Sequence, residues 1–570
     1  IWFHLWPNAY KNDSTAFAKQ QIRMNNLRFS NSEIKDRGFI DSLNFIVNGI
    51  KTNMEEHPEW IDVIKLILPN KLLPNQSIII ETPFYVKLPL VFSRLGHSGN
   101  HYEITQWYPK PAVYDHKGWH EMPYLNMGEF YSEFGIFDVK ITLPEDYRIM
   151  ATGDLVNNED EYRWLDSLSI LSDSLHALSK KDFKSKIKLM QKESYVQNES
   201  DSLSIKMKTL HFRQKNVHDF AWFADKNWIV RKGALFLSDS TKKITLWSFY
   251  LPKNAELWEH SIEYLHDSGY WYSKFYGDYP YDHLTAVDGD LSAGGGMEYP
   301  NITVISSGGS QDLLEYVIMH EVGHNWFYGI IGSNERDHTW MDEGLNEYSN
   351  IRYWQKKYES RNEQILIQNF IQNTLGIGKN LSMSWINYAS YVGNAIDKDA
   401  QPLHLTADEY SQSNYGQHYM KPAVFMRFLE HYIGEDKIDL IFKDFFDQWK
   451  FKHPYPEDLE NIFDVHIDEN LDWFFDNVFE KTTYIDYRVT DTRNKFVLSN
   501  DGNFTCPVEV AYYDMYDEEL DREWIRGIKH ETILKPPLGT IKVKIDPDEH
   551  MPDINRSNNG TSKNYEFNFI

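Results

Sequence analysis

The sequence predicts a multidomain α+β protein with a β-rich N-terminal domain, a mainly helical central domain and a small C-terminal β domain. The chain has 570 residues, enough for about three domains of 100 to 200 residues. Apolar residues make up 41% and aromatic residues 15% of it, as expected of packed cores rather than a disordered chain. The hydrophobic pattern changes along the chain from strand-like to helix-like and back. We expect domains at residues 1–230, 231–485 and 486–570.

The N-terminal domain is predicted to be mainly antiparallel β structure. Apolar and polar residues alternate from Ser77 to Val91 and from Phe130 to Leu143, with many β-branched and aromatic side chains. Residues 157–201 differ, because they are charged, rich in Ser, Lys and Leu, and have apolar residues at helical intervals. We expect a helical insertion there that decorates the surface.

The central domain carries three long helical patterns. They cover Asp312–Tyr328, Asn346–Tyr358 and Tyr419–Tyr432, and loops rich in Gly and Asn separate them. The residues with recognisable chemistry fall in this domain, so we expect the functional site here.

The C-terminal domain is predicted to be a small, β-sandwich-like unit. Short alternating stretches at Glu509–Tyr513 and Thr540–Ile545 read as strands, and Asn-Asp-Gly and Pro-Asp turns bound them. The chain starts at Ile1 without an initiator Met and ends in an apolar, strand-like stretch, Asn564–Ile570. We therefore expect this chain to be part of a longer polypeptide.

The charge and cysteine content exclude some classes of function. The chain has 84 acidic and 58 basic residues, a formal charge of −26, so its field repels phosphate backbones and nucleic acid is not an expected partner. The single cysteine, Cys506, rules out an internal disulfide. No run of about 18 uncharged apolar residues occurs, so no transmembrane helix is predicted.

One helical pattern contains the sequence His320-Glu321-Val322-Gly323-His324. A spacing of four residues places both imidazoles on one face of a helix, where they can share a metal ion. Glu321 lies between them and is expected to act as general base toward a water molecule at the metal.

Glu343 is the candidate third ligand. Eighteen residues separate it from His324, and we expect it in the first turn of a second helix. Two histidines and one carboxylate leave a tetrahedral zinc ion one position short, as a catalytic site requires, whereas a structural site usually uses several cysteines. The alternative is that these residues are ordinary helix-surface groups joined by ion pairs or hydrogen bonds, but the ligand types, order and spacing together favour zinc.

Two further segments carry a family resemblance. Gly294-Gly-Gly-Met-Glu-Tyr-Pro300 is similar to a Gly-x-Met-Glu-Asn exopeptidase motif, and Tyr419-Met-Lys-Pro-Ala423 is similar to a Tyr-x-Lys-Gly-Ala segment. With the histidine motif, they make the chain resemble, over nearly its whole length, the aminopeptidase N family of gluzincin zinc metallopeptidases, which also contains leukotriene hydrolase. Two positions depart from the family pattern: Tyr299 replaces the Asn of the first motif, and Pro422 replaces the Gly of the second.

The resemblance implies a thermolysin-like catalytic domain that holds one zinc ion per chain through His320, His324 and Glu343, with Glu321 as general base. It implies that Tyr419 stabilises the transition state, and we prefer this residue to Tyr415 because Met-Lys-Pro-Ala follows it.

The resemblance also implies a substrate-binding segment. Gly295, Gly296 and Met297 are expected to border the substrate, and Glu298 to hold its free amine. An N-terminal residue joins this glutamate in relatives, and Gln106 is our candidate for it, although burial as a strand residue is an equal alternative.

These expectations describe a zinc aminopeptidase that acts on peptides with a free N-terminus. The alternatives are a gluzincin endopeptidase and a catalytically silent peptide-binding scaffold, with hydrolysis of a lipid epoxide as an open side activity. A silent scaffold has usually lost a ligand or the general base, and both are present here. By resemblance alone, we expect a bacterial periplasmic or other extracytoplasmic location.

Overall fold

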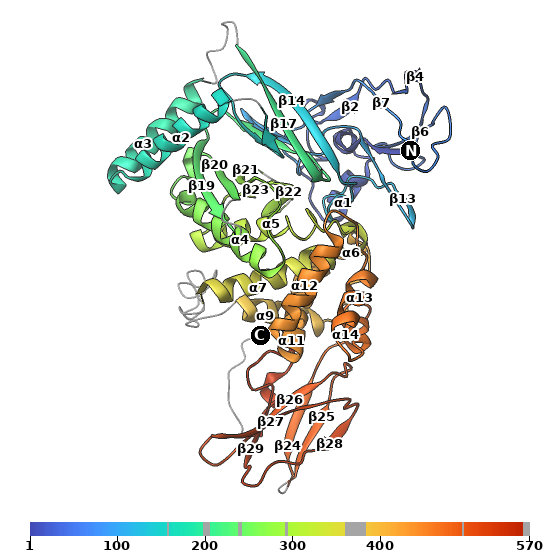
Figure 1. Ribbon diagram of the computed structural model, residues 1–570, viewed down its shortest axis with the longest axis vertical. Helices are drawn as coiled ribbons and strands as arrows, with labels where there is room; N and C mark the ends of the chain where they lie inside the picture. Colours follow the sequence, from blue (N-terminus) through green and yellow to red (C-terminus); the bar gives the residue numbers. More distant parts are fainter. Residues whose placement is uncertain are drawn as a thin grey trace. The chain divides into compact units, whose positions relative to one another are not determined.

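The computed structural model describes residues 1–156, 159–197, 206–237, 242–290, 294–358, 383–492 and 495–561 (Figure 1). They form two compact units: residues 1–336 with 449–453, and residues 337–448 with 454–570. The chain is a multidomain α+β protein with β-rich N-terminal, helical central and small β-sheet C-terminal regions, which confirms the predicted fold class. The three predicted domain boundaries stay predictions.

The first unit begins with small, mainly antiparallel sheets. Its longest strand pair is β14 (Gly135–Pro144) with β17 (Met207–Val217). The strand predicted from Phe130 therefore starts five residues later than expected. Between Ser77 and Val91 the predicted β structure forms as two short strands, β7 (Ile80–Glu81) and β8 (Tyr85–Lys87). Pro83 lies between them, and a proline cannot donate a ladder hydrogen bond.

The remaining strands of these sheets are short. Their orders are β11-β1-β6-β5, β15-β18-β10-β9, β14-β17-β16, β4-β3-β7, β2-β8 and β12-β13. The bounds not yet given are β1 (Trp2–His4), β2 (Phe39–Asp41), β3 (Ile46–Val47), β4 (Ile50–Lys51), β5 (Met54–Glu56), β6 (Val63–Leu66), β9 (Gly96–Ser98), β10 (His101–Ile104), β11 (Lys110–Pro111), β12 (Val113–Asp115), β13 (Gly118–His120), β15 (Arg148–Ala151), β16 (Asp154–Leu155) and β18 (Trp222–Asp225), with helix α1 (Ala16–Arg23).

Two helices fall in the segment read as a helical insertion. They are α2 (Glu159–His176) and α3 (Lys180–Gln197), and α2 packs against β19 (Ile229–Phe236). Part of the predicted segment, residues 157–158 and 198–201, lies outside the described residues.

A five-stranded sheet follows in the first unit. Its order is β19-β20-β21-β23-β22, with β20, β21 and β23 parallel and β22 antiparallel at the edge. All residues of β21 are buried, as expected of a parallel strand covered on both faces. Helix α5 packs on β22 and β23, and this pairing positions the site. The bounds are β20 (Lys243–Tyr250), β21 (His283–Gly289), β22 (Gly296–Tyr299), β23 (Ile302–Ser306), α4 (Ser261–Phe275) and α5 (Gln311–Gly323).

The second unit begins with helices and ends in two three-stranded sheets. The sheet orders are β24-β25-β28 and β27-β26-β29. The helical patterns predicted from Asn346 and from Tyr419 correspond to α7 and α11, and each helix begins within two residues of the expected start. The bounds are α7 (Leu345–Tyr358), α9 (Met383–Ala395), α10 (Gln412–Tyr415), α11 (Gln417–Ile433), α12 (Glu435–Trp449), α13 (Pro456–His466), α14 (Asp472–Val478), β24 (Tyr487–Asp491), β25 (Phe496–Asn500), β26 (Val508–Tyr513), β27 (Glu519–Ile525), β28 (Glu531–Ile533) and β29 (Lys542–Ile545).

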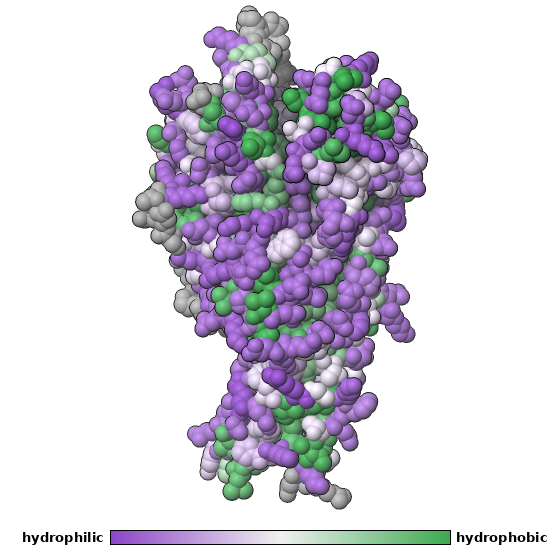
Figure 2. All heavy atoms as spheres, turned by 45° about the vertical axis from the view of Figure 1, so that its right-hand side comes forward, coloured by the Kyte–Doolittle hydropathy of each residue, from purple (hydrophilic) through white to green (hydrophobic). Residues whose placement is uncertain are grey.

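The surface agrees with the composition. The face drawn in Figure 2 is mostly hydrophilic, with smaller hydrophobic areas between the polar side chains, as expected of a chain with 84 acidic and 58 basic residues. Among the residues that the structure describes, every helix is too short or too polar to cross a membrane.

Candidate active site

Helix α5 and the residue that follows it carry the two histidines of the predicted pair. Ser310 caps its start, since the Ser310 hydroxyl accepts a 3.2 Å hydrogen bond from the N–H of Leu313. His320 and His324 are buried, and their Nε2 atoms lie 3.2 Å apart. Two nitrogens that each lie 2.0 to 2.1 Å from one tetrahedral zinc ion would be about 3.4 Å apart. The pair therefore fits a shared zinc ion.

Helix α5 is shorter than predicted. It ends at Gly323 rather than Tyr328, so His324 follows its last residue directly. Tyr328 has φ of 89°, which no helix accommodates. The side chain of Asn325 ties the helix end to the sheet, because its Oδ1 accepts a 3.2 Å hydrogen bond from the N–H of Asn301, which follows β22. The turn after the helix thus fixes His324 relative to β22.

Glu321 lies against the first residue of β22. A Cβ atom at Gly296 would be only 2.4 Å from Oε1 of Glu321, so the absence of a side chain there admits the carboxylate. Gly295 differs, because the nearest atom to its Cβ position is a methyl group of Val317 at 3.9 Å. Of the two predicted glycines, only Gly296 is sterically required.

The next three residues of β22 alternate between its two faces. Glu298 shares a face with Gly296 and is 6% exposed. On the other face, the Nε–H of Arg94 contacts Sδ of Met297 at 2.8 Å, and the Tyr299 hydroxyl donates a 3.1 Å hydrogen bond to Oε1 of Gln106. The Tyr that departs from the family motif therefore contacts the candidate Gln.

Gln106 is buried within a polar network. It has φ of 46° and is 2% exposed. Its Nε2 lies 3.5 Å from Oδ2 of Asp219, which also pairs with Nζ of Lys110 at 3.0 Å and accepts a 2.9 Å hydrogen bond from Tyr108 at Oδ1. Its predicted contact with the substrate amine stays a prediction, and its contacts in the structure are with Tyr299 and Asp219.

Glu343 lies in a π-helical turn, residues Trp340–Gly344, that leads directly into α7. It thus precedes the regular helix in whose first turn it was predicted. It is 7% exposed, and its Oε1 accepts a 2.6 Å hydrogen bond from the hydroxyl of Tyr419 on α11. The Tyr415 ring lies 6.4 Å from the Tyr419 ring.

Gly344 lets α11 approach this turn closely. A Cβ atom at Gly344 would lie 2.6 Å from the carbonyl oxygen of His418 and 2.6 Å from Cβ of Pro422. Pro422 is inside α11. The proline that replaces the family's Gly therefore packs against a glycine, and this contact lies beside the Tyr419–Glu343 hydrogen bond.

Of the three predicted ligands, His320 and His324 belong to the first unit and Glu343 belongs to the second. The two imidazoles and one carboxylate are a donor set that zinc prefers, and they leave a fourth position open. All three residues are buried or nearly so. The chemistry of the donor set thus fits a catalytic zinc ion.

Sequence reasoning assigned no role to Glu347, which is fully buried on α7. Its two carboxylate oxygens accept hydrogen bonds from the side-chain amides of Asn350 at 2.8 Å and Asn387 at 2.7 Å. Its spacing of four residues from Glu343 could have indicated a supporting role. Arg94 was also missed, and no local signal could have found it, because it is 203 residues from Met297.

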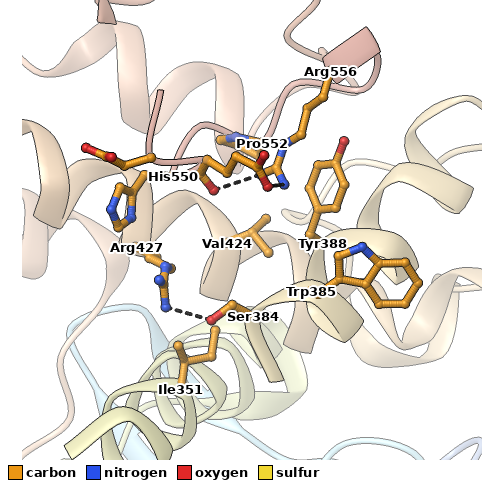
Figure 3. Close-up of a pocket in the computed structure, with 11 residues that line it drawn as sticks. Ile351, Ser384, Trp385, Tyr388, Val424, Arg427, His550, Pro552 and Arg556 are labelled. Atoms are coloured by element: carbon orange, nitrogen blue, oxygen red, sulfur yellow. Dashed lines mark hydrogen bonds and ion pairs between the residues drawn. The ribbon is translucent and has the colours of Figure 1, made fainter. Parts of the chain in front are cut away.

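A separate cavity of about 200 Å³ lies in the second unit (Figure 3). Arg427 donates a 2.6 Å hydrogen bond to the hydroxyl of Ser384, and the Arg556 guanidinium lies 3.7 Å from the centre of the Tyr388 ring. Nη1 of Arg556 also lies 3.5 Å from Oε2 of Glu549. These contacts join α9 and α11 to the segment that follows β29.

Parts of this chain are similar to known proteins. Residues 269–478 match the model of the peptidase family M1 domain. Among curated proteins, glutamyl aminopeptidase of Bos taurus is 22% identical over 265 residues, which is 43% of this chain and 25% of that protein. Aminopeptidase B of Mus musculus is 25% identical over 171 residues, 29% of this chain and 24% of that protein. The matched segments thus span about a quarter of the length of these relatives.

A solved structure shows the same fold. The crystal structure of Legionella pneumophila aminopeptidase A in complex with aspartic acid aligns with a TM-score of 0.60 and 12% identity, and it covers 93% of this chain and 56% of that one. The zinc-helix segment, the distant sequence relatives and the shared fold all agree with the resemblance predicted from the motifs. Residues 269–478, which include the predicted zinc-ligand and substrate-binding motifs, are similar to the peptidase family M1 domain.

Proposed function

We propose that this chain is a zinc-dependent aminopeptidase that hydrolyses the N-terminal peptide bond of peptides. The observation that carries the proposal is the arrangement of β22 against α5: Gly296 makes room for Glu321, and Glu298 follows on the same face of the strand. A proton acceptor and an amine-binding carboxylate thus lie on neighbouring elements. Relatives named aminopeptidases support the reaction class.

One zinc ion per chain is proposed to bind to His320, His324 and Glu343. When bound, zinc supplies a Lewis acid that polarises a carbonyl group and lowers the pKa of water. The 3.2 Å separation of the two Nε2 atoms supports the histidine half of this assignment. Two neutral imidazoles and one carboxylate contribute a single negative charge, which the double positive charge of a bound zinc ion would exceed. The site with zinc bound would therefore stay positively charged and attract a carbonyl oxygen.

Glu321 is proposed to take a proton from the attacking water and to return it to the leaving amine. Its place against Gly296 restricts the positions open to its carboxylate. The Tyr419 hydroxyl is proposed to donate a hydrogen bond to the carbonyl oxygen as negative charge develops on it. To make this contact, the Tyr419 hydroxyl would have to give up its hydrogen bond to Glu343. Rotation of the hydroxyl allows that exchange.

Glu298 is proposed to hold the free amine of the substrate, with Gly295, Gly296 and Met297 bordering the peptide. A peptide amine is largely protonated below its pKa of about 7.7 to 8.0. A charge-assisted bond to a desolvated carboxylate is worth about 1.5 to 3 kcal/mol. That energy would favour the first peptide bond by about 10- to 150-fold over an internal bond.

The test is to incubate one peptide in free and N-acetylated forms with the protein, with and without a chelator. We expect stepwise release of residues from the free peptide, none from the acetylated peptide, and no activity after chelation. Glu298→Ala should raise KM and lower kcat for the free peptide while zinc stays bound. Internal cleavage of both peptides at equal rates would replace this function with the endopeptidase alternative, and binding without cleavage would indicate a silent scaffold.

A further inference from the structure

Strand β22 lies at the edge of its sheet, so contacts made by its side chains must help to hold it in place. It is hydrogen-bonded to β23 on one side. Glu298 points from one face, and Met297 and Tyr299 point from the other. Any group that fixes Met297 and Tyr299 therefore also fixes the direction of Glu298.

The hydroxyl of Tyr299 reaches the amide of Gln106 across 193 residues of sequence. Both side chains are buried, with 4% and 2% exposed, so water cannot readily replace either partner. Breaking such a bond leaves a buried polar group unpaired, which costs more than the bond itself contributes. The hydrogen bond between Tyr299 and Gln106 therefore anchors the C-terminal end of β22.

Asp219 sets the direction of the Gln106 amide. Burial tends to raise the pKa of the Asp219 carboxyl, but the ammonium of Lys110, His218 and the backbone N–H of Phe220 together outweigh burial and keep that pKa below its usual range. An ionised carboxylate only accepts hydrogen bonds, so it selects the Nε2 donor side of the Gln106 amide. The Oε1 acceptor is then turned toward Tyr299.

The backbone of Gln106 gives independent support. Its φ of 46° lies in the left-handed region, where residues other than glycine and asparagine are strained. The Phe220 N–H and the Tyr108 hydroxyl donate to Oδ1 of Asp219 at 2.7 and 2.9 Å and hold the network that faces this residue. The fold thus keeps Gln106 in an unfavourable conformation that directs its amide at β22.

We propose that Gln106 and Tyr299 are a positioning pair that holds Glu298 in the orientation that binds the substrate amine. This inference rests on the proposed aminopeptidase function. Gln106 then acts through the strand rather than by touching the substrate. It also accounts for the strained backbone of Gln106 together with the tyrosine at position 299, which provides the hydroxyl that the glutamine binds.

The test compares a peptide that has a free α-amine with the same peptide lacking that amine. The ratio of the two kcat/KM values measures how well Glu298 recognises the amine. In Tyr299→Phe and in Gln106→Leu we expect this ratio to fall by about 3- to 10-fold, the effect of one misplaced hydrogen-bonding group. Because both variants break the same bond, the double variant should fall no further than the lower single variant.

The matched control is Tyr281→Phe. The Tyr281 hydroxyl is also buried and donates a 2.8 Å hydrogen bond, to the carbonyl of Asn216, away from β22. Its removal should leave the ratio unchanged, and zinc content and thermal unfolding should show that each variant is folded. Should Tyr299→Phe fail to fold, Gln106→Leu and Asp219→Asn carry the same expectation.

The outcomes separate the two proposals. A parent enzyme without preference for the free amine overturns the aminopeptidase function. A parent with that preference, combined with variants that lose activity equally on both peptides or not at all, overturns the positioning role alone. A loss in the double variant equal to the product of the single losses also contradicts the pair.

Discussion

The hydroxyl of Tyr419 donates a hydrogen bond of 2.6 Å to Oε1 of Glu343. This contact joins α11 to the turn that carries the candidate carboxylate ligand. We expect Tyr419→Phe to lower kcat by about 100- to 1,000-fold, the effect of removing one oriented donor to a developing oxyanion, while zinc stays bound. Tyr415→Phe is the matched control and should remain active. If the losses are reversed between the two variants, the role belongs to Tyr415.

Glu321→Gln should keep the fold and the zinc ion but remove nearly all turnover. Glutamine has the same shape as glutamate and cannot accept the proton from water. Steady-state rates and metal content on one preparation provide the measurement. Turnover at a tenth of the parent rate or more would exclude Glu321 as the general base.

Gly296→Ala should reduce turnover strongly, because the added methyl group would lie 2.4 Å from Oε1 of Glu321 and must displace it. Gly393→Ala, on α9, is the control, since nothing from another part of the described chain lies within 4 Å of a Cβ atom placed there. We expect kcat to fall at least 10-fold in the first variant, on the order of 1.4 kcal/mol, and to stay near the parent value in the second. Equal effects in both variants would show that the close contact does not matter.

His324→Ala should abolish stable zinc binding, because two remaining ligands are too few for a zinc site. Elemental analysis after dialysis measures this directly. His404→Ala, which changes an exposed histidine of the second unit, should retain the metal. Full retention of zinc by His324→Ala would contradict the assigned ligand set.

The buried Lys421 predicts a pH-dependent stability difference. Burial lowers the pKa of its ammonium from 10.5 to about 7, and its Nζ donates a 2.8 Å hydrogen bond to the carbonyl of Lys481. Between these two pKa values the unfolded chain binds more protons than the folded chain, so this group makes the free energy of unfolding rise with pH. Lys421→Met removes that slope.

Unfolding of the parent and of Lys421→Met should therefore be compared by denaturant titration from pH 7 to pH 10. The free energy of unfolding of the variant, minus that of the parent, should be largest near pH 7 and decrease by about 1.4 kcal/mol per pH unit toward pH 10. Lys437→Met, at an exposed position on α12, should show no such trend. A flat difference for Lys421→Met would mean that the lysine is charged in the folded state at neutral pH.

Much of the site could be predicted because its chemistry lies in short local patterns. The four-residue spacing of His320 and His324 needs only helical geometry, and Glu343 and Glu298 each belong to a compact motif. The end of α5 could not be predicted in the same way. His324, Asn325 and Trp326 continue the helical pattern, but the contact of Asn325 with Asn301 comes from a different part of the chain.

The contacts made by the two residues that differ from the family pattern could not be predicted from the local sequence either. Tyr299 meets Gln106, and Pro422 meets Gly344, through contacts between distant segments. Hydrophobic patterns do not encode such pairings. The β structure between Ser77 and Val91 is divided into two strands for a simpler reason, since Pro83 lies between them and cannot donate a ladder hydrogen bond.

Pro422 also has a mechanical consequence for α11. A proline has no N–H, so the carbonyl of His418 lacks the helical hydrogen bond that residue 422 would otherwise donate. The missing bond lies in the turn that carries Tyr419. The turn that carries Tyr419 therefore depends less on hydrogen bonds within the helix and more on packing, since the carbonyl of His418 and Cβ of Pro422 lie directly against Gly344.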